Sequence, residues 1–169
     1  MTSDIEQVVR NRVASFGDRC ELLPCDPAYA DTAAFCTHYG YDPHDSANTI
    51  LVASRREPVL YAAAIVLADS RLDVNKTLRK LMGVRRLSFA TADQTRHITG
   101  MMIGGVTPFA LPDGLDIYID AAVMTRPFVI LGGGSRSLKV RTKPDVLTEL
   151  AATEVITGLA IPVADDEPA

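Results

Sequence analysis

The stretch NTILVASRREPVLYAAAIVL, from Asn48 to Leu67, contains two runs rich in β-branched and other apolar residues. Residues 48–53 and 59–67 form these runs, and Arg55, Arg56, Glu57 and Pro58 between them have the composition of a turn. Each run has the length of an ordinary strand. The stretch therefore predicts a β-hairpin.

The segments on either side of this hairpin predict a mixture of helices and strands. Apolar residues at helical spacing predict a helix from Ile5 to Phe16 that ends at Gly17, and Asp31 is a candidate N-cap for a helix that ends at Gly40. Further helices are expected over residues 73–83, 93–99 and 144–150, and short strands over residues 87–89, 115–119, 128–131 and 138–140. This mixed order favours an α+β fold with a mixed sheet over a doubly wound parallel sheet.

Length and composition indicate one domain. The chain has 169 residues, of which 47% are hydrophobic, and this is enough for a substantial core. We expect the domain to cover residues 1–160 and an acidic, flexible tail to cover residues 161–169. No apolar run approaches the roughly 20 residues that span a membrane, and the N-terminus lacks the pattern of a secretion signal, so a cytoplasmic protein is expected.

Charge and cysteine content exclude some classes of function. The net charge of −4 disfavours a broad nucleic-acid platform, although a small basic patch remains compatible with it. Cys20, Cys25 and Cys36 are odd in number and are expected to be reduced thiols. Their spacing does not fit a zinc site, and the histidines are scattered. We therefore expect no metal and no cofactor.

The segment TGMMIGGVTP, residues 99–108, is the most informative local feature for function. Adjacent glycines at Gly104 and Gly105 let the backbone approach a ligand closely and leave N–H groups free to point at one oxygen. Pro108 would stiffen the far end of this loop. The same composition also fits an ordinary tight connection.

Two further features are weaker candidates for a binding site. The run Gly132, Gly133, Gly134 with Ser135 fits either an anion-binding nest or, more simply, a hairpin turn. Asp120, at the end of a predicted strand, could position a ligand or cap the next turn. No G-x-S-x-G motif or other signature of a Ser-His-Asp site is present.

Taken in order, several segments resemble the YbaK/prolyl-tRNA-synthetase-associated family of aminoacyl-tRNA editing domains. The resemblance runs from about Ile5 to Leu150. It rests on segments that match the family's strand with a Lys-Thr-Leu core, its Leu-Asp helix start, its Gly-x-x-x-Pro loop, and its later strand and glycine turn. These are ANTILV at residues 47–52, RLDV at 71–74, TG at 99–100 with GGVTP at 104–108, YID at 118–120 and LGGG at 131–134.

The resemblance implies a mixed, barrel-like β-sheet surrounded by helices, and hydrolysis of the ester that links a wrong amino acid to a tRNA without a metal. It implies that the backbone of Gly104, Gly105, Val106, Thr107 and Pro108 holds the aminoacyl carbonyl. It also implies a substrate-binding pocket lined by a second set of residues, namely Asn48, Thr99, Gly100, Asp120, Gly132, Gly133, Gly134 and Ser135. The implied partners are the 3′ end of an aminoacyl-tRNA and, as a second candidate, a tRNA synthetase.

One position departs from the family pattern. Asn48 stands where the family has a lysine that contacts the tRNA end. Asparagine donates a hydrogen bond but carries no charge. Lys76 lies in a similar Lys-Thr-Leu triplet, but that triplet falls in a predicted helix and is expected to face solvent. Arg55 and Arg136 are alternative sources of positive charge.

Three hypotheses follow from these observations. The first is a free-standing aminoacyl-tRNA deacylase that acts in trans. The second is a non-catalytic binding module on the same scaffold, motivated by Asn48 and the acidic balance. The third is a structural protein that oligomerises through exposed apolar faces.

Overall fold

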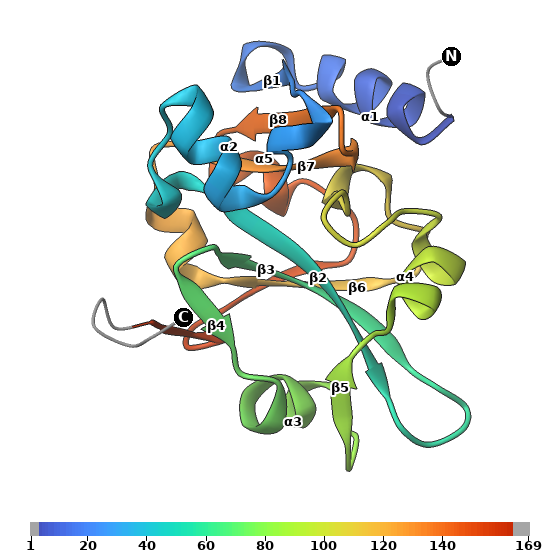
Figure 1. Cartoon of the computed structure of the whole chain (residues 1–169). Coiled ribbons are helices and arrows are strands. Elements are labelled where there is room, and N and C mark those ends of the chain that lie inside the picture. The colour runs from blue at the N-terminus through green and yellow to red at the C-terminus, as the bar shows by residue number, and fades with distance from the viewer. Residues whose placement is uncertain (1–3, 164–169) are drawn as a thin grey trace.

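The computed structural model describes residues 4–163 and arranges their strands in three sheets (Figure 1). The largest sheet has the order β5-β2-β3-β6-β9, the second β1-β8-β7, and the smallest β10-β4. The strands are β1 (Cys20–Pro24), β2 (Ala47–Ser54), β3 (Tyr61–Leu67), β4 (Ser70–Leu72), β5 (Leu87–Phe89), β6 (Asp116–Asp120), β7 (Val129–Ser135), β8 (Leu138–Thr142), β9 (Thr153–Ile156) and β10 (Ala160–Pro162).

The helices lie around these sheets, with α1 and α2 beside the three-stranded sheet and α3 near β5 (Figure 1). They are α1 (Asp4–Ala14), α2 (Thr32–Tyr39), α3 (Arg79–Met82), α4 (Ala92–Thr99) and α5 (Pro144–Thr148), and a π-helical turn at Val74–Leu78 leads into α3. Gly40 and Gly100 end α2 and α4 in the left-handed conformation, with φ of 77° and 72°. These helices match the sequence prediction to within a few residues.

The predicted hairpin is confirmed. Strands β2 and β3 pair antiparallel, with Ala47 opposite Leu67 and Ala53 opposite Tyr61. Strand β6 pairs parallel to β3, and β9 pairs parallel to β6, so the sheet is mixed as expected. The strands form three sheets and do not close into one barrel.

Packing on both faces of β2 explains why this strand is so apolar. Leu51 belongs to the largest core cluster, together with Val9, Phe109 and Ile119. Val52, its neighbour in the strand, points to the opposite face and packs in a second cluster with Leu78. Successive side chains of a strand alternate between its faces, so a strand that is buried twice is apolar throughout.

A small third cluster lies beneath α2 and places this helix over the junction of two sheets. It contains Cys25, Ala30, Phe35 and Ile130. Ile130 of β7 also forms an isolated parallel bridge with Ser46, which immediately precedes β2. The start of β2 is thereby joined to the three-stranded sheet, and this junction is where the candidate site lies.

Two sequence expectations are corrected by the fold. The glycines 132–134 do not form a hairpin turn, because they lie within β7 and the chain reverses between Ser135 and Leu138, with a bulge in the pairing. The tail does not begin at Ile161, because Ile161 pairs with Arg71 in the two-stranded sheet. The rest of the expected tail, from residue 164, lies outside the described residues. Strands β1, β4, β9 and β10 were not predicted.

Candidate functional site

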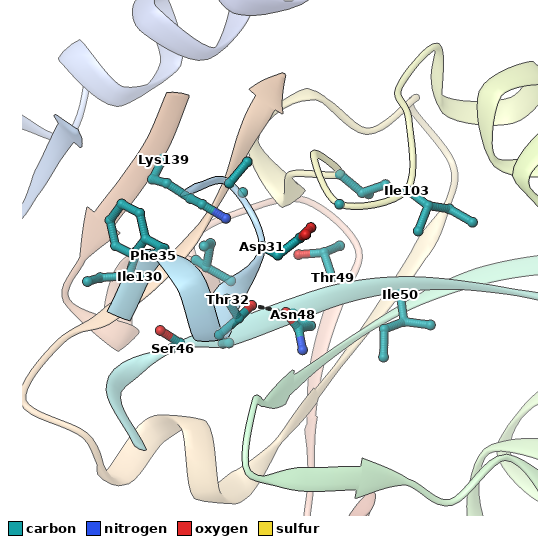
Figure 2. Close-up of a pocket in the computed structure, with 16 residues that line it drawn as sticks. Asp31, Thr32, Phe35, Ser46, Asn48, Thr49, Ile50, Ile103, Ile130 and Lys139 are labelled. Atoms are coloured by element: carbon teal, nitrogen blue, oxygen red, sulfur yellow. Dashed lines mark hydrogen bonds between the residues drawn. The ribbon is translucent and has the colours of Figure 1, made fainter. Parts of the chain in front are cut away.

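A cavity of about 260 Å³ lies where α2, β2, β7, β8 and the loop before Pro108 meet (Figure 2). Its walls combine buried apolar side chains with hydroxyl, amide and charged groups. The residues that line it are Ala30, Asp31, Thr32, Phe35, Ser46, Ala47, Asn48, Thr49, Ile50, Ile103, Gly104, Val106, Ile130, Leu131, Gly132 and Lys139. Sequence reasoning expected three of the elements that meet here, namely β2, the loop and the glycine segment.

Asn48 stands at the rim of this pocket. Its side chain is exposed, and its Oδ1 accepts a hydrogen bond of 3.4 Å from the Thr32 hydroxyl of α2 (Figure 2). Asn48 therefore lines the pocket, but it also ties the strand to the helix that covers the site. The Lys76 side chain is exposed on the helical segment before α3, as expected.

The predicted carbonyl-holding loop contributes two of its five residues to the pocket wall. Gly104 and Val106 face the cavity, and the structure gives their N–H groups no protein acceptor within residues 4–163. The N–H of Gly105, between them, donates to the carbonyl of Met102 at 2.9 Å. Two free donors that flank a tight turn can bind one carbonyl oxygen.

The other two residues of the loop hold it from behind. Thr107 is completely buried, and its hydroxyl accepts a hydrogen bond of 3.3 Å from the N–H of Phe109. Pro108 is buried and opens a short 3₁₀ helix, residues Pro108–Ala110. These residues fix the far end of the loop and do not line the pocket.

The glycine segment supports the loop by close backbone contact. A Cβ on Gly132 would lie only 2.5 Å from the carbonyl oxygen of Val106, and one on Gly105 would lie 3.2 Å from the backbone of Ser135. The N–H of Gly134 donates to the carbonyl of Gly105 at 2.8 Å. The glycines thus allow the backbones of β7 and the loop to come into contact. Glycine is needed here for this close approach and not to form a turn.

Six of the predicted pocket residues lie outside the cavity lining. Thr99 and Gly100 end α4, where the Thr99 hydroxyl accepts from the Met101 N–H at 3.1 Å. Asp120 is buried and accepts from the N–H of Ala160 at 3.1 Å, so it anchors β10. The remaining three belong to the glycine segment. Gly133 packs against Leu138, Gly134 packs against Ile5 of α1, and the Ser135 hydroxyl donates to the Glu6 carboxylate.

Of the two arginines that are alternative sources of positive charge, only Arg136 lies near the site. The Arg136 guanidinium lies beside Gly104 and donates to the Asp31 carboxylate at 3.2 Å and to the Pro27 carbonyl at 3.0 Å. It therefore ties the β7–β8 connection to the start of α2 at the pocket rim. Arg55 instead lines a separate surface hollow together with Arg56, Arg85 and Arg86.

Lys139 is the functional candidate that sequence reasoning missed. It lies in β8, is only 8% exposed, and its Nζ sits 5.5 Å from the centre of the Phe35 ring. Burial lowers the pKa of Lys139, while Cys25, Asp31 and Cys36 oppose this effect and Arg136 adds to it. Leu138 and Val140 flank Lys139 in the strand, and side chains of a strand alternate between its two faces, so the sequence alone would place the Lys139 side chain in solvent. In the structure, α2 covers that face of the strand.

The described part of the chain offers little sign of other cofactor or membrane sites. Within residues 4–163, His, Cys, Asp and Glu side chains form no group of three or more that could hold a metal ion. In the same range, every helix is too short or too polar to cross a membrane. The three cysteines are buried free thiols, and burial raises the pKa values of Cys20 and Cys25.

Comparison with known proteins assigns the family. The sequence pattern of the aminoacyl-tRNA editing domain matches residues 26–150, which is most of the chain. The chain therefore belongs to the aminoacyl-tRNA editing domain family. The matched range contains every pocket-lining residue, including Asn48 and Lys139.

Solved structures share the fold at low sequence identity. A crystal structure described as a hypothetical protein has a TM-score of 0.80 at 23% identity, over 91% of this chain and 99% of that one. A candidate trans-editing enzyme for prolyl tRNA synthetase has a TM-score of 0.78 at 22% identity, over 93% and 98%. A signal transduction protein candidate from Marinobacter aquaeolei VT8 has a TM-score of 0.60 at 19% identity, over 92% of this chain and 30% of its own.

Proposed function

We propose that this chain is a free-standing deacylase that hydrolyses the ester of mischarged aminoacyl-tRNA in trans. The observation that carries the proposal is the open cavity beside Asn48, lined by Gly104 and Val106, whose N–H groups have no acceptor within residues 4–163. Family membership supports an aminoacyl-tRNA as the ligand. The 3′ end of the tRNA is the proposed partner, and a tRNA synthetase that releases the mischarged tRNA is a second one.

The loop would act on the carbonyl group of the ester. Its two free N–H groups would hold the carbonyl oxygen and stabilise the negative charge that develops when water adds to the carbonyl carbon. The bond from this carbon to the ribose oxygen then breaks, and a proton from the water passes to that oxygen. The products are the free amino acid and a tRNA with an intact terminal hydroxyl.

The pocket lining contains few groups able to activate water. Of the residues that line it, only Asp31 and Lys139 have ionisable side chains, and the Asp31 carboxylate is held by Arg136 at the rim. A buried ammonium does not accept a proton. We therefore propose that groups of the substrate itself assist the attack of water, as the family resemblance implies.

A deacylation assay over a panel of mischarged tRNAs tests this function. Folded protein should accelerate hydrolysis of at least one member, and a rate equal to the uncatalysed rate on every member would disprove the proposal. Gly104→Ala should lower kcat/KM, because Gly104 lines the pocket and has a φ of 94°, which is strained for alanine. Gly114→Ala is the matched control, because Gly114 has a φ of 83° but no neighbour within 4 Å of the added Cβ.

A binding module without catalysis is the second candidate, and Asn48 is the observation that favours it. Asn48 is neutral, and its hydrogen bond with Thr32 gives it a structural role. If the wild-type protein is inactive, Asn48→Lys tests whether the missing lysine is the cause. If the variant also fails to hydrolyse any tRNA ester, the absence of a lysine at position 48 is not the cause of inactivity.

A further inference from the structure

The pocket has a closed end and an open end that differ in chemistry. Phe35, Ser46 and Lys139 are buried and form the closed end, whereas Ile103 is 57% exposed at the opening. Figure 2 shows Lys139 and Phe35 on one side of the cavity, and Ile50 and Ile103 on the other. A ligand that enters past Ile103 therefore meets a positive charge at the far end.

The ammonium of Lys139 has no hydrogen-bond acceptor or ion-pair partner within residues 4–163. Its Nζ lies over the Phe35 ring, 5.5 Å from the ring centre. Asp31, the nearby carboxylate, is bound to Arg136, and its side chain is 77% exposed. The ammonium is not among the fully buried atoms that lack a partner, so it is open to the cavity and available to a ligand.

A second polar group in the pocket is also unsatisfied. The Thr49 hydroxyl is buried and has no hydrogen-bond partner, alone in this respect among the buried side-chain N and O atoms of residues 4–163. Figure 2 shows the Thr49 side chain in the space between Asp31 and Asn48. The nearby Ser46 hydroxyl has only the Cys36 sulfur at 3.4 Å. The cavity thus contains both a cation and hydroxyl groups that lack strong acceptors.

We propose that the closed end of the pocket is a subsite for a negatively charged group of the ligand, which Lys139 binds with help from the Thr49 hydroxyl. This inference rests on the proposed function, under which the group is the side-chain carboxylate of an aspartyl or glutamyl ester. The chain would then remove acidic amino acids from tRNA in preference to neutral ones of the same shape.

Two observations favour a side-chain carboxylate over a phosphate of the tRNA. A backbone phosphate continues into further nucleotides on both sides, whereas a closed end receives the terminal part of a ligand. The cavity of about 260 Å³ is also slightly smaller than typical small-molecule sites, which begin at roughly 300 Å³. It has room for an amino-acid side chain next to the loop but little for a whole nucleotide.

Hydrolysis of matched substrates tests the subsite. Wild-type protein should hydrolyse aspartyl- or glutamyl-tRNA with a kcat/KM about 10- to 100-fold above that for the asparaginyl or glutaminyl counterpart, as expected for a hydrogen bond between charged groups. Lys139→Met should abolish this ratio by lowering kcat/KM for the acidic substrates to that for their neutral counterparts. Lys143→Met, which removes an exposed lysine four residues away, should leave the ratio unchanged.

A binding measurement separates failure of the subsite from failure of the proposed function. The probes are adenosine with a 3′-amide-linked aspartyl group and the same compound with asparaginyl, neither of which can be hydrolysed as an ester. Tighter binding of the aspartyl compound that Lys139→Met removes supports the subsite, even if every tRNA ester is left intact. Equal binding of the two compounds overturns it, even if the protein hydrolyses neutral esters.

A separate binding experiment tests whether the subsite binds a phosphate instead. Adenosine 5′-monophosphate and adenosine are compared for binding to the wild type and to Lys139→Met. The assignment to a side-chain carboxylate would be overturned by two results together. Binding of the monophosphate would depend on Lys139, and the protein would bind the aspartyl and asparaginyl compounds equally well. Thermal unfolding of each variant confirms that the protein measured is folded.

Discussion

Gly132→Ala gives a direct test of whether the contact between β7 and the loop positions the proposed carbonyl-binding groups. The added Cβ would lie 2.5 Å from the carbonyl oxygen of Val106 and 3.2 Å from the carbonyl carbon of Gly105. Ordinary van der Waals contact begins at 3.4 Å, so the loop must move away by about 0.9 Å. Both obstructing atoms are backbone atoms, which cannot rotate out of the way as a side chain can.

This displacement predicts a larger loss of activity than of stability. Overpacking of this kind costs about 1–3 kcal/mol in the free energy of unfolding. A misplacement of about 1 Å in a catalytic constellation lowers the rate by roughly 100-fold. We therefore expect Gly132→Ala to fold, to unfold at lower denaturant concentration, and to lose about two orders of magnitude in kcat/KM for deacylation.

Urea unfolding and single-turnover deacylation on the same preparation would measure both effects. Leu147→Ala, in the buried face of α5 and outside the pocket lining, is the control because it should cost about 2–5 kcal/mol in stability. At a temperature where it remains folded, its kcat/KM should match the wild type. A folded Gly132→Ala variant with wild-type kcat/KM would refute the view that this close approach positions the loop.

Three further predictions concern stability. Lys139→Met should equal or exceed the wild type in stability at pH 7. Because folding lowers the pKa of Lys139, this difference in stability should shrink as pH rises through the lowered pKa toward the ordinary value of 10.5. Unfolding curves at several pH values would show the change. His44→Asn should destabilise the protein more at pH 5.5 than at pH 8.5, because the hydrogen bond with Asp69 raises the pKa of His44. The stability that this pair contributes is fully present below pH 6.5 and is lost as pH rises through the raised pKa. Equal losses of stability at both pH values would contradict this prediction. Thr91→Ala should cost about 1 kcal/mol by thermal unfolding, because the Thr91 hydroxyl accepts from the Gln94 N–H in a capping box at the start of α4.

Much of the local structure was predictable because its signals lie close together in the sequence. The turn residues between the runs 48–53 and 59–67 predicted the hairpin, and glycines at positions 40, 83 and 100 marked where helices end. Strands such as β4, β9 and β10 were missed because each is only three or four residues long. Such short strands are defined by pairing with distant partners, and a local pattern does not contain that information.

The candidate site was predictable in part for the same reason. The loop around Gly104 and the position of Asn48 were identified from the order of motifs, and both face the cavity. Asp120 was expected in the pocket because it ends a strand, but its carboxylate is used to hold the N–H of Ala160. A carboxylate at the end of a strand can either position a ligand or accept a hydrogen bond from a backbone N–H. The path of the chain that follows decides which of these it does.

The sequence by itself determined the family and the place of the loop, because these depend on residue identity and order. Only the tertiary structure decided the role of the glycines in β7 and the place of Lys139. The glycines look like a turn until the backbone of the loop is seen within contact distance of Gly132. Lys139 looks like a solvent-facing strand residue until α2 covers that face, since burial of a side chain depends on which element packs above it.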